Sequence, residues 1–259
     1  MPNSDRQRAY LYFAISAGII GLILIGRLAL KPPAVDGETG CTEKIENKTV
    51  FLIDHTEGIP EQTRREIIAR STKYILDDTM VKEGDLVSIF FLTELSKNNL
   101  VPAFMRCKPR KEGNAATEDA KKIRKEFETK FLTPVRDLLE GPIPTSPQSP
   151  VGQAIIDLSL SDQLRGAPNA NLIIFSDLIE NSDSFSMYHC PADAIAQWNV
   201  LRIGAVARPT FTNVRVQAHV IPRRYLSKES ITCRDKFWVW FFGDNAGPKA
   251  SFTPDDLPG

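Results

Sequence analysis

The chain has 259 residues, of which 42% are hydrophobic and 25% are charged, a composition typical of globular proteins and unlike that of disordered chains. Its 32 lysines and arginines balance its 32 aspartates and glutamates, so the formal net charge is zero. This balance gives no electrostatic reason to expect nucleic acid as a partner. The basic residues of segment 108–125 lie among acidic neighbours, which indicates a solvated loop and helix face.

A long apolar segment, residues 10–30, lies near the start of the sequence. It is apolar apart from Ser16 and Arg27, and its length matches the roughly 20 residues that a helix needs to cross a bilayer. We therefore expect residues 1–31 to form a short tail and a transmembrane helix that acts as an uncleaved signal anchor. A cleaved signal peptide is the alternative, although the segment exceeds the roughly 7 to 15 residues of a signal core.

Four cysteines, Cys41, Cys107, Cys190 and Cys233, all follow this apolar segment. An even number suits two disulfides in an oxidising compartment, and their positions favour pairing Cys41 with Cys107 and Cys190 with Cys233. Four reduced cysteines are the alternative. We expect a single-pass membrane protein with its soluble domain outside the cytoplasm, in the periplasm or the extracellular space.

Residues 32–48, which include two prolines and two glycines, predict a polar linker, and residues 49–259 predict one α/β domain. The first predicted strand, 49–53, is rich in β-formers and ends at Asp54. A helix is expected from Pro60 to about residue 77, because apolar residues recur there on one face.

Two apolar runs, 85–93 and 99–105, then predict an antiparallel hairpin at a sheet edge. The next helix is expected from residue 120 until Pro134 interrupts it. Ser149 and Pro150 predict the cap and first residue of another helix. The later predicted elements are strands at 171–176, 198–207 and 214–220 and a final helix over 227–242.

These elements predict a Rossmann-like fold, with a mostly parallel central sheet, one antiparallel edge hairpin and helices on both faces. In such sheets ligands bind outside the carboxyl ends of the strands. Asp54 and Asp177 each directly follow a predicted strand, so we expect them at the same edge of the sheet.

The segments VFLIDHTEG and LIIFSDLIEN, separated by a helix and a hairpin, resemble the von Willebrand factor type A fold over about residues 49–207. In that family a divalent-metal adhesion site uses an Asp-x-Ser-x-Ser motif, a hydroxyl from a later loop and an aspartate after the fourth strand. The resemblance implies Asp54, Thr56, Ser149 and Asp177 as ligands of Mg²⁺, Mn²⁺ or Ca²⁺. The sequence departs from the motif at Gly58, so the implied site is degenerate.

Together with the predicted anchor at residues 10–30, the resemblance implies a membrane-anchored module that binds or assembles with a protein partner near a membrane, without enzymatic activity. His55 and Glu57 lie in the predicted site loop and are candidate partner contacts. The aromatic run 237–242 mostly predicts core, but we expect Trp238 or Trp240 near the surface, where a partner could contact it.

An enzymatic alternative remains open. The sequence Asp-x-Thr-x-Gly from Asp54 is also similar to that of haloacid dehalogenase phosphohydrolases, in which such an aspartate is a Mg²⁺-dependent nucleophile. Thr56 stands where those enzymes usually carry a second aspartate, and no lysine is placed to hold the phosphate.

Overall fold

The computed structural model describes residues 3–29, 34–93, 100–115, 117–142, 145–243 and 251–258. The chain forms two units, residues 1–35 and residues 36–259. The first contains a single helix, α1 (Asn3–Ala29). Its side chains from Tyr10 to Ile20 are exposed.

The expected transmembrane helix is not confirmed. Among the residues that the structure describes, no helix combines the length and apolar character needed to cross a membrane. The prediction of a single-pass membrane protein held by residues 10–30 is therefore wrong.

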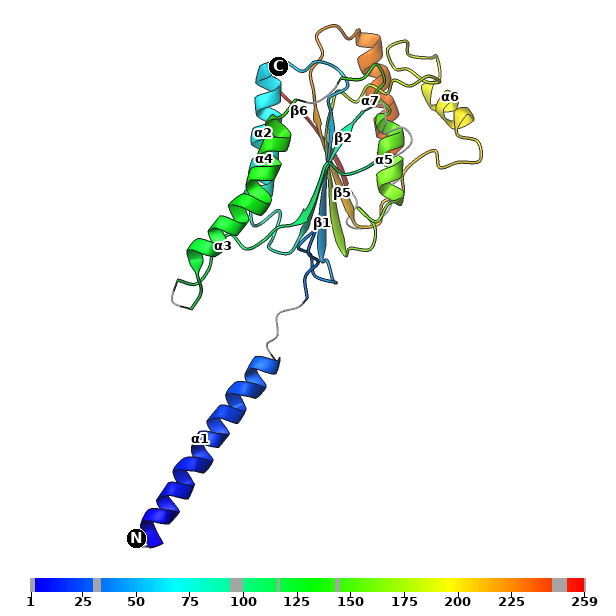
Figure 1. The fold of residues 1–259 in the computed structure, drawn as a ribbon. Helices are drawn as coiled ribbons and strands as arrows, with labels where there is room; N and C mark the ends of the chain where they lie inside the picture. Colours follow the sequence, from blue (N-terminus) through cyan, green and yellow to red (C-terminus); the bar gives the residue numbers. More distant parts are fainter. Residues whose placement is uncertain are drawn as a thin grey trace. The chain divides into compact units, whose positions relative to one another are not determined.

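The second unit is built on one sheet with six strands in the order β3-β2-β1-β4-β5-β6 (Figure 1). All neighbouring strands are parallel except β2 and β3, so the predicted sheet with one antiparallel edge pair is confirmed. The strands are β1 (Asn47–Asp54), β2 (Leu86–Leu92), β3 (Phe104–Cys107), β4 (Asn169–Ser176), β5 (Val214–Val220) and β6 (Ser251–Asp256).

Strand β6 was not predicted, because its sequence SFTPDD holds a proline and two aspartates, which are poor strand formers. Its place at the edge of the sheet explains why it forms. Pro254 pairs in register with Ala218 of β5, and an edge strand tolerates the missing proline N–H.

Helices cover both faces of the sheet (Figure 1). On one side are α2 (Glu61–Leu76) and α4 (Thr133–Glu140), and on the other are α5 (Val151–Leu160) and α7 (Lys228–Gly243). Alternate residues of β1 point to opposite faces. Phe51 and Ile53 therefore join the core under α2, whereas Val50 and Leu52 join the core under α5 and α7. Burial on both faces explains why β1 and β4 read as continuous apolar runs.

Pro134 does not end the helix that precedes it. The segment runs through α3 (Ala120–Phe127) and a π-helical turn, η2 (Glu128–Leu132), directly into α4. In this turn the backbone N–H of Thr133 donates to the carbonyl oxygen of Glu128, five residues back, and Pro134 lies in the first turn of α4, where its missing N–H costs little. The helical segment ends instead at Glu140, with Gly141 as its C-cap.

The strand predicted over 198–207 is also wrong. This segment contains the end of α6 (Ala194–Leu201) followed by turns. The side chain of Asp193 caps α6 by accepting from the backbone N–H of Ala196 at 2.9 Å. The Trp198 indole, which is buried, donates to the carbonyl oxygen of Ala207 at 2.7 Å, so the chain folds back over the helix. Asp193 was the capping signal that the strand prediction overlooked.

Both predicted disulfides are confirmed. Cys41 bonds to Cys107 at the end of β3, which fastens the segment from residue 36 onward to the sheet. Cys190 bonds to Cys233 in α7, which fastens the loop before α6 to that helix. Two disulfides are typical of an oxidising, extracytoplasmic compartment.

Candidate functional site

The candidate site lies where the order of the sheet reverses. The chain moves outward from β1 to β2 on one side and from β4 to β5 on the other, so β1 and β4 meet at the switch point. In open α/β sheets ligands bind outside the carboxyl ends of the strands at such a point. Asp54 ends β1, Ser176 ends β4, and Asp177 follows directly.

Asp54 is the centre of a buried hydrogen-bond network. Its Oδ1 accepts from the backbone N–H of Thr56 at 3.1 Å and from the Thr56 hydroxyl at 2.7 Å. Its Oδ2 accepts from the hydroxyls of Ser149 at 2.9 Å and Ser176 at 2.8 Å. Asp54 is only 1% exposed, and the four donors compensate for the burial of its charge.

Three of the four predicted ligands are therefore brought together: Asp54, Thr56 and Ser149. The predicted capping role of Ser149 is wrong, because Pro150 occupies the cap position of α5 and makes no side-chain cap bond. Instead, the backbone of Ser149 exchanges two hydrogen bonds with Asn181, at 2.8 and 3.0 Å, in the loop after β4. These bonds fix the Ser149 hydroxyl over Asp54.

Asp177 has a different partner. Its Oδ2 accepts from Nε of Arg223 at 2.7 Å, and its Oδ1 accepts from the backbone N–H of Ile179 at 2.9 Å. Burial, and next the charge of Asp54, raise the pKa of Asp177 to about 6, while Arg223 opposes this rise. Burial lowers the pKa of Arg223, but the Asp177 carboxylate more than offsets this and leaves it raised. The two side chains thus form a buried ion pair at neutral pH.

Glu57 lies at the rim of the site between two tyrosines. Its carboxylate accepts short hydrogen bonds from the hydroxyls of Tyr188 and Tyr225, and one of its oxygens is 3.9 Å from Nε of Arg223. The two tyrosine rings are stacked, with centroids 6.5 Å apart. Tyr225 is 60% exposed, so its ring is open to a partner.

Four residues of the site were not predicted from the sequence: Ser176, Tyr188, Arg223 and Tyr225. Two of them carried a signal. Ser176 directly precedes Asp177, and Arg223 lies three residues beyond the end of β5, where the same rule about strand ends applies. The tyrosines carried none, since their approach to Glu57 depends on loops far apart in sequence.

The remaining predicted contacts, His55, Trp238 and Trp240, range from partly to fully buried. His55 is partly buried with its ring against Phe91, and burial, followed by the charge of Arg64, lowers its pKa to about 4. Trp238 is 1% exposed and belongs to the core. Trp240 is half-buried, with the Arg208 guanidinium 4.9 Å from its ring centroid.

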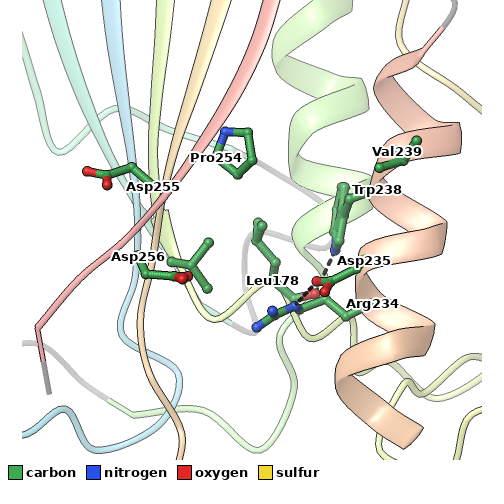
Figure 2. Close-up of a pocket in the computed structure, with 9 residues that line it drawn as sticks. Leu178, Arg234, Asp235, Trp238, Val239, Pro254, Asp255 and Asp256 are labelled. Carbon is green, nitrogen blue, oxygen red and sulfur yellow. Dashed lines mark hydrogen bonds and ion pairs between the residues drawn. The ribbon is translucent and has the colours of Figure 1, made fainter. Parts of the chain in front are cut away.

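A hollow of about 250 Å³ lies between α7 and the edge strand β6 (Figure 2). Trp238 lines it and donates to the carbonyl oxygen of Leu178 at 2.6 Å, while Arg234 pairs with its neighbour Asp235 at 2.8 Å. The Trp238 bond holds α7 against the loop after β4, which carries Asp177.

A divalent ion does not fit this set as it stands. The oxygens of Asp54, Thr56 and Ser149 are of the type that Mg²⁺ prefers. The guanidinium of Arg223, however, already supplies the positive charge beside Asp177, and Gly58 offers no hydroxyl. Metal binding stays a prediction that titration must test.

Comparison with known proteins gives structural similarity only. No protein-family model and no curated protein matches the chain. Among solved structures, proximal thread matrix protein 1 from the mussel byssus is 11% identical with a TM-score of 0.37, and the match covers 74% of this chain but only 41% of that one. The manganese-loaded TRAP protein of Plasmodium vivax is 14% identical with a TM-score of 0.35, covering 81% of this chain and 68% of that one.

An aerotolerance-related membrane protein from Bacteroides fragilis, carrying multiple mutations to serine, is 11% identical with a TM-score of 0.35 and is matched over 82% of this chain and 92% of its own. Identities and TM-scores this low establish no family for the chain and carry no argument about its fold.

Proposed function

We propose that the second unit, residues 36–259, is a protein-binding module whose partner docks at the carboxyl ends of β1, β4 and β5. The observation that carries this proposal is the rim formed by Glu57, Tyr188 and Tyr225 over the buried Asp177–Arg223 pair. Tyrosine and arginine dominate the binding energy of many protein interfaces, and a rigid rim loses little entropy when a partner binds.

Several hydrogen bonds between loops support a preformed surface. The loops after β1 and before α5 are joined by the bond from the Ser146 N–H to the Thr56 carbonyl at 2.8 Å. The loops before α5 and after β4 are joined through Ser149 and Asn181. Since each loop is bonded to the next, we expect little backbone rearrangement on binding.

The phosphohydrolase alternative is less consistent with the site. A phosphoryl nucleophile must reach its substrate, but the Asp54 side chain is buried and both of its oxygens already accept two hydrogen bonds. Binding requires no such access to Asp54. Incubation with a generic phosphate ester and Mg²⁺ tests this alternative, and turnover that disappears in Asp54→Asn would favour the enzyme.

Site-specific photocrosslinking tests the binding proposal. A photoreactive phenylalanine analogue is placed at Tyr225 and, as a matched control, at exposed Lys111, which lies beyond β3 on the chain. We expect a defined crosslinked protein in the native host from position 225 and not from position 111. With that partner purified, Tyr225→Ala should weaken its binding about tenfold or more, the effect of one interface hot spot. Crosslinks from position 111 alone would contradict the proposed surface.

A further inference from the structure

We infer that Arg223 is the resident cation of this site, bridging the two loops that a divalent ion would otherwise join. Its Nε donates to Asp177 in the loop after β4, at 2.7 Å, and its Nη1 donates to the carbonyl oxygen of Gly58 in the loop after β1, at 2.6 Å. One guanidinium therefore ties together the carboxyl ends of the two strands at the switch point.

The burial of this pair makes it a fixed part of the site. The side chains of Arg223 and Asp177 are only 4% and 3% exposed. An ion pair shielded from water is screened much less by salt than an exposed pair, and arginine stays protonated under all ordinary conditions. The positive charge beside Asp177 is therefore permanent, whereas a bound metal would come and go with its concentration.

The same geometry excludes a divalent ion from Asp177. An ion bound there would lie next to the guanidinium, and the two positive charges would repel each other in a poorly solvated place. The ion would also have to break the bond between Arg223 and Asp177 to gain a ligand. The second serine of the Asp-x-Ser-x-Ser motif is replaced by Gly58, whose backbone carbonyl faces Arg223.

The chain offers a direct way to reverse this arrangement. A Cβ added at Gly58 would meet nothing within 4 Å, and the backbone there is not left-handed. A serine side chain can therefore be placed at position 58 without a clash. Removing the guanidinium in the same protein would leave Asp54, Thr56, Ser149 and Asp177 with an added hydroxyl and no competing charge.

The test is calorimetric titration of Mn²⁺ and Mg²⁺ into the full chain with its disulfides intact. The wild type should show no saturable binding. Arg223→Ala combined with Gly58→Ser should bind one Mn²⁺ per chain, and this binding should disappear when Asp177→Asn is added. The matched control is Arg224→Ala with Gly58→Ser, since Arg224 is the exposed neighbour; it should stay free of metal.

Each outcome decides the inference. Saturable binding to the wild type that Asp177→Asn abolishes would show a metal site despite Arg223 and would overturn it. If the folded variant with Arg223→Ala and Gly58→Ser bound no metal, the inference would also be overturned, because the guanidinium would not be what excludes the ion.

A double-mutant cycle covers the case in which loss of Arg223 unfolds the site. If Arg223 is the counter-charge of Asp177, the fall in melting temperature caused by Arg223→Gln should be largely reversed by adding Asp177→Asn. Additive losses of melting temperature would contradict the inference.

One consequence rests on the proposed function: binding of the partner crosslinked at Tyr225 should be unchanged in EDTA. Absence of any partner at this surface would overturn the proposed function but leave the metal titrations as they stand. If EDTA abolished partner binding and Mn²⁺ restored it, the proposed binding surface would be supported, but the role of Arg223 as resident cation would be overturned.

Discussion

The carboxyl group of Glu180 accepts a hydrogen bond from the backbone N–H of Gly152 at 2.6 Å, at the first turn of α5. Glu180 is 1% exposed. Burial, which outweighs the Gly152 bond and the charge of Arg202, raises the pKa of Glu180 from 4.5 to about 8. The loop after β4 therefore carries a carboxyl group that is mostly protonated at neutral pH.

This raised pKa predicts a pH-dependent stability. Because the folded-state pKa lies above the unfolded value, the contribution of Glu180 is fully present below about pH 4.5 and is lost as pH rises toward 8. Relative to Glu180→Gln, the wild type should lose free energy of unfolding across this window, by at most about 1.4 kcal/mol per pH unit. Denaturant unfolding of both proteins from pH 5 to 8 measures the difference, and parallel curves would contradict the assignment.

The contact between Gly152 and Trp198 predicts a second effect on stability. A Cβ at position 152 would lie 2.8 Å from one ring atom of Trp198 and 3.2 Å from another. Since this ring is buried and cannot move freely, Gly152→Ala should lower the free energy of unfolding by about 1 to 3 kcal/mol. Gly58→Ala is the matched control, because its Cβ meets nothing, and its effect should stay within about 0.5 kcal/mol. Equal melting curves for the two variants would argue against the close packing of Trp198.

The disulfides predict large and separable losses of stability. Their cysteines are 66 residues apart in Cys41–Cys107 and 43 residues apart in Cys190–Cys233. Chain entropy then gives about 4 kcal/mol for either bond. Replacing each pair by serines in turn should lower the free energy of unfolding by amounts of this order.

Hydrogen exchange would separate the local effects of the two bonds. Loss of Cys41–Cys107 should expose the amides of residues 36–46, and loss of Cys190–Cys233 should expose those near Tyr188. The same pattern of exchange in both variants would mean that neither bond holds its own segment.

The central strands could be predicted because both of their faces are buried. A continuous apolar run such as that of β1 predicts where the strand lies. It therefore also predicts that Asp54 stands at the end of the strand. Where the prediction failed, features other than the apolar pattern decided the structure. Asp193 caps α6 and Trp198 bonds to Ala207 where a strand was predicted, and an edge position allows Pro254 in β6.

The candidate site shows the same division. Asp54, Thr56 and Ser149 were predicted from motif and strand ends, and they do meet. The pairing of Asp177 with Arg223 was not predicted. The place of Arg223 just beyond β5 indicated the right edge of the sheet, but not which side chain it would contact there. The apolar pattern of the sequence locates the ends of the strands. The pairing of charged side chains at those ends depends on loop conformations, which the pattern does not predict.

The last prediction concerns Trp238, which belongs to the core and also bonds to the loop after β4. Its indole N–H donates to the carbonyl of Leu178, a residue in the left-handed conformation with φ of 59° (Figure 2). Trp238→Phe keeps an aromatic ring but leaves that buried carbonyl without its donor, which should cost about 1 to 3 kcal/mol of the free energy of unfolding. Trp240→Phe is the matched control on the same helix. Trp240 is half-buried with Arg208 over its ring, and phenylalanine keeps an aromatic face there, so the free energy of unfolding should fall by about 1 kcal/mol or less. If the control were the more damaging change, α7 would be held chiefly by its outer face, and the bond to Leu178 would not be what fixes the loop that carries Asp177.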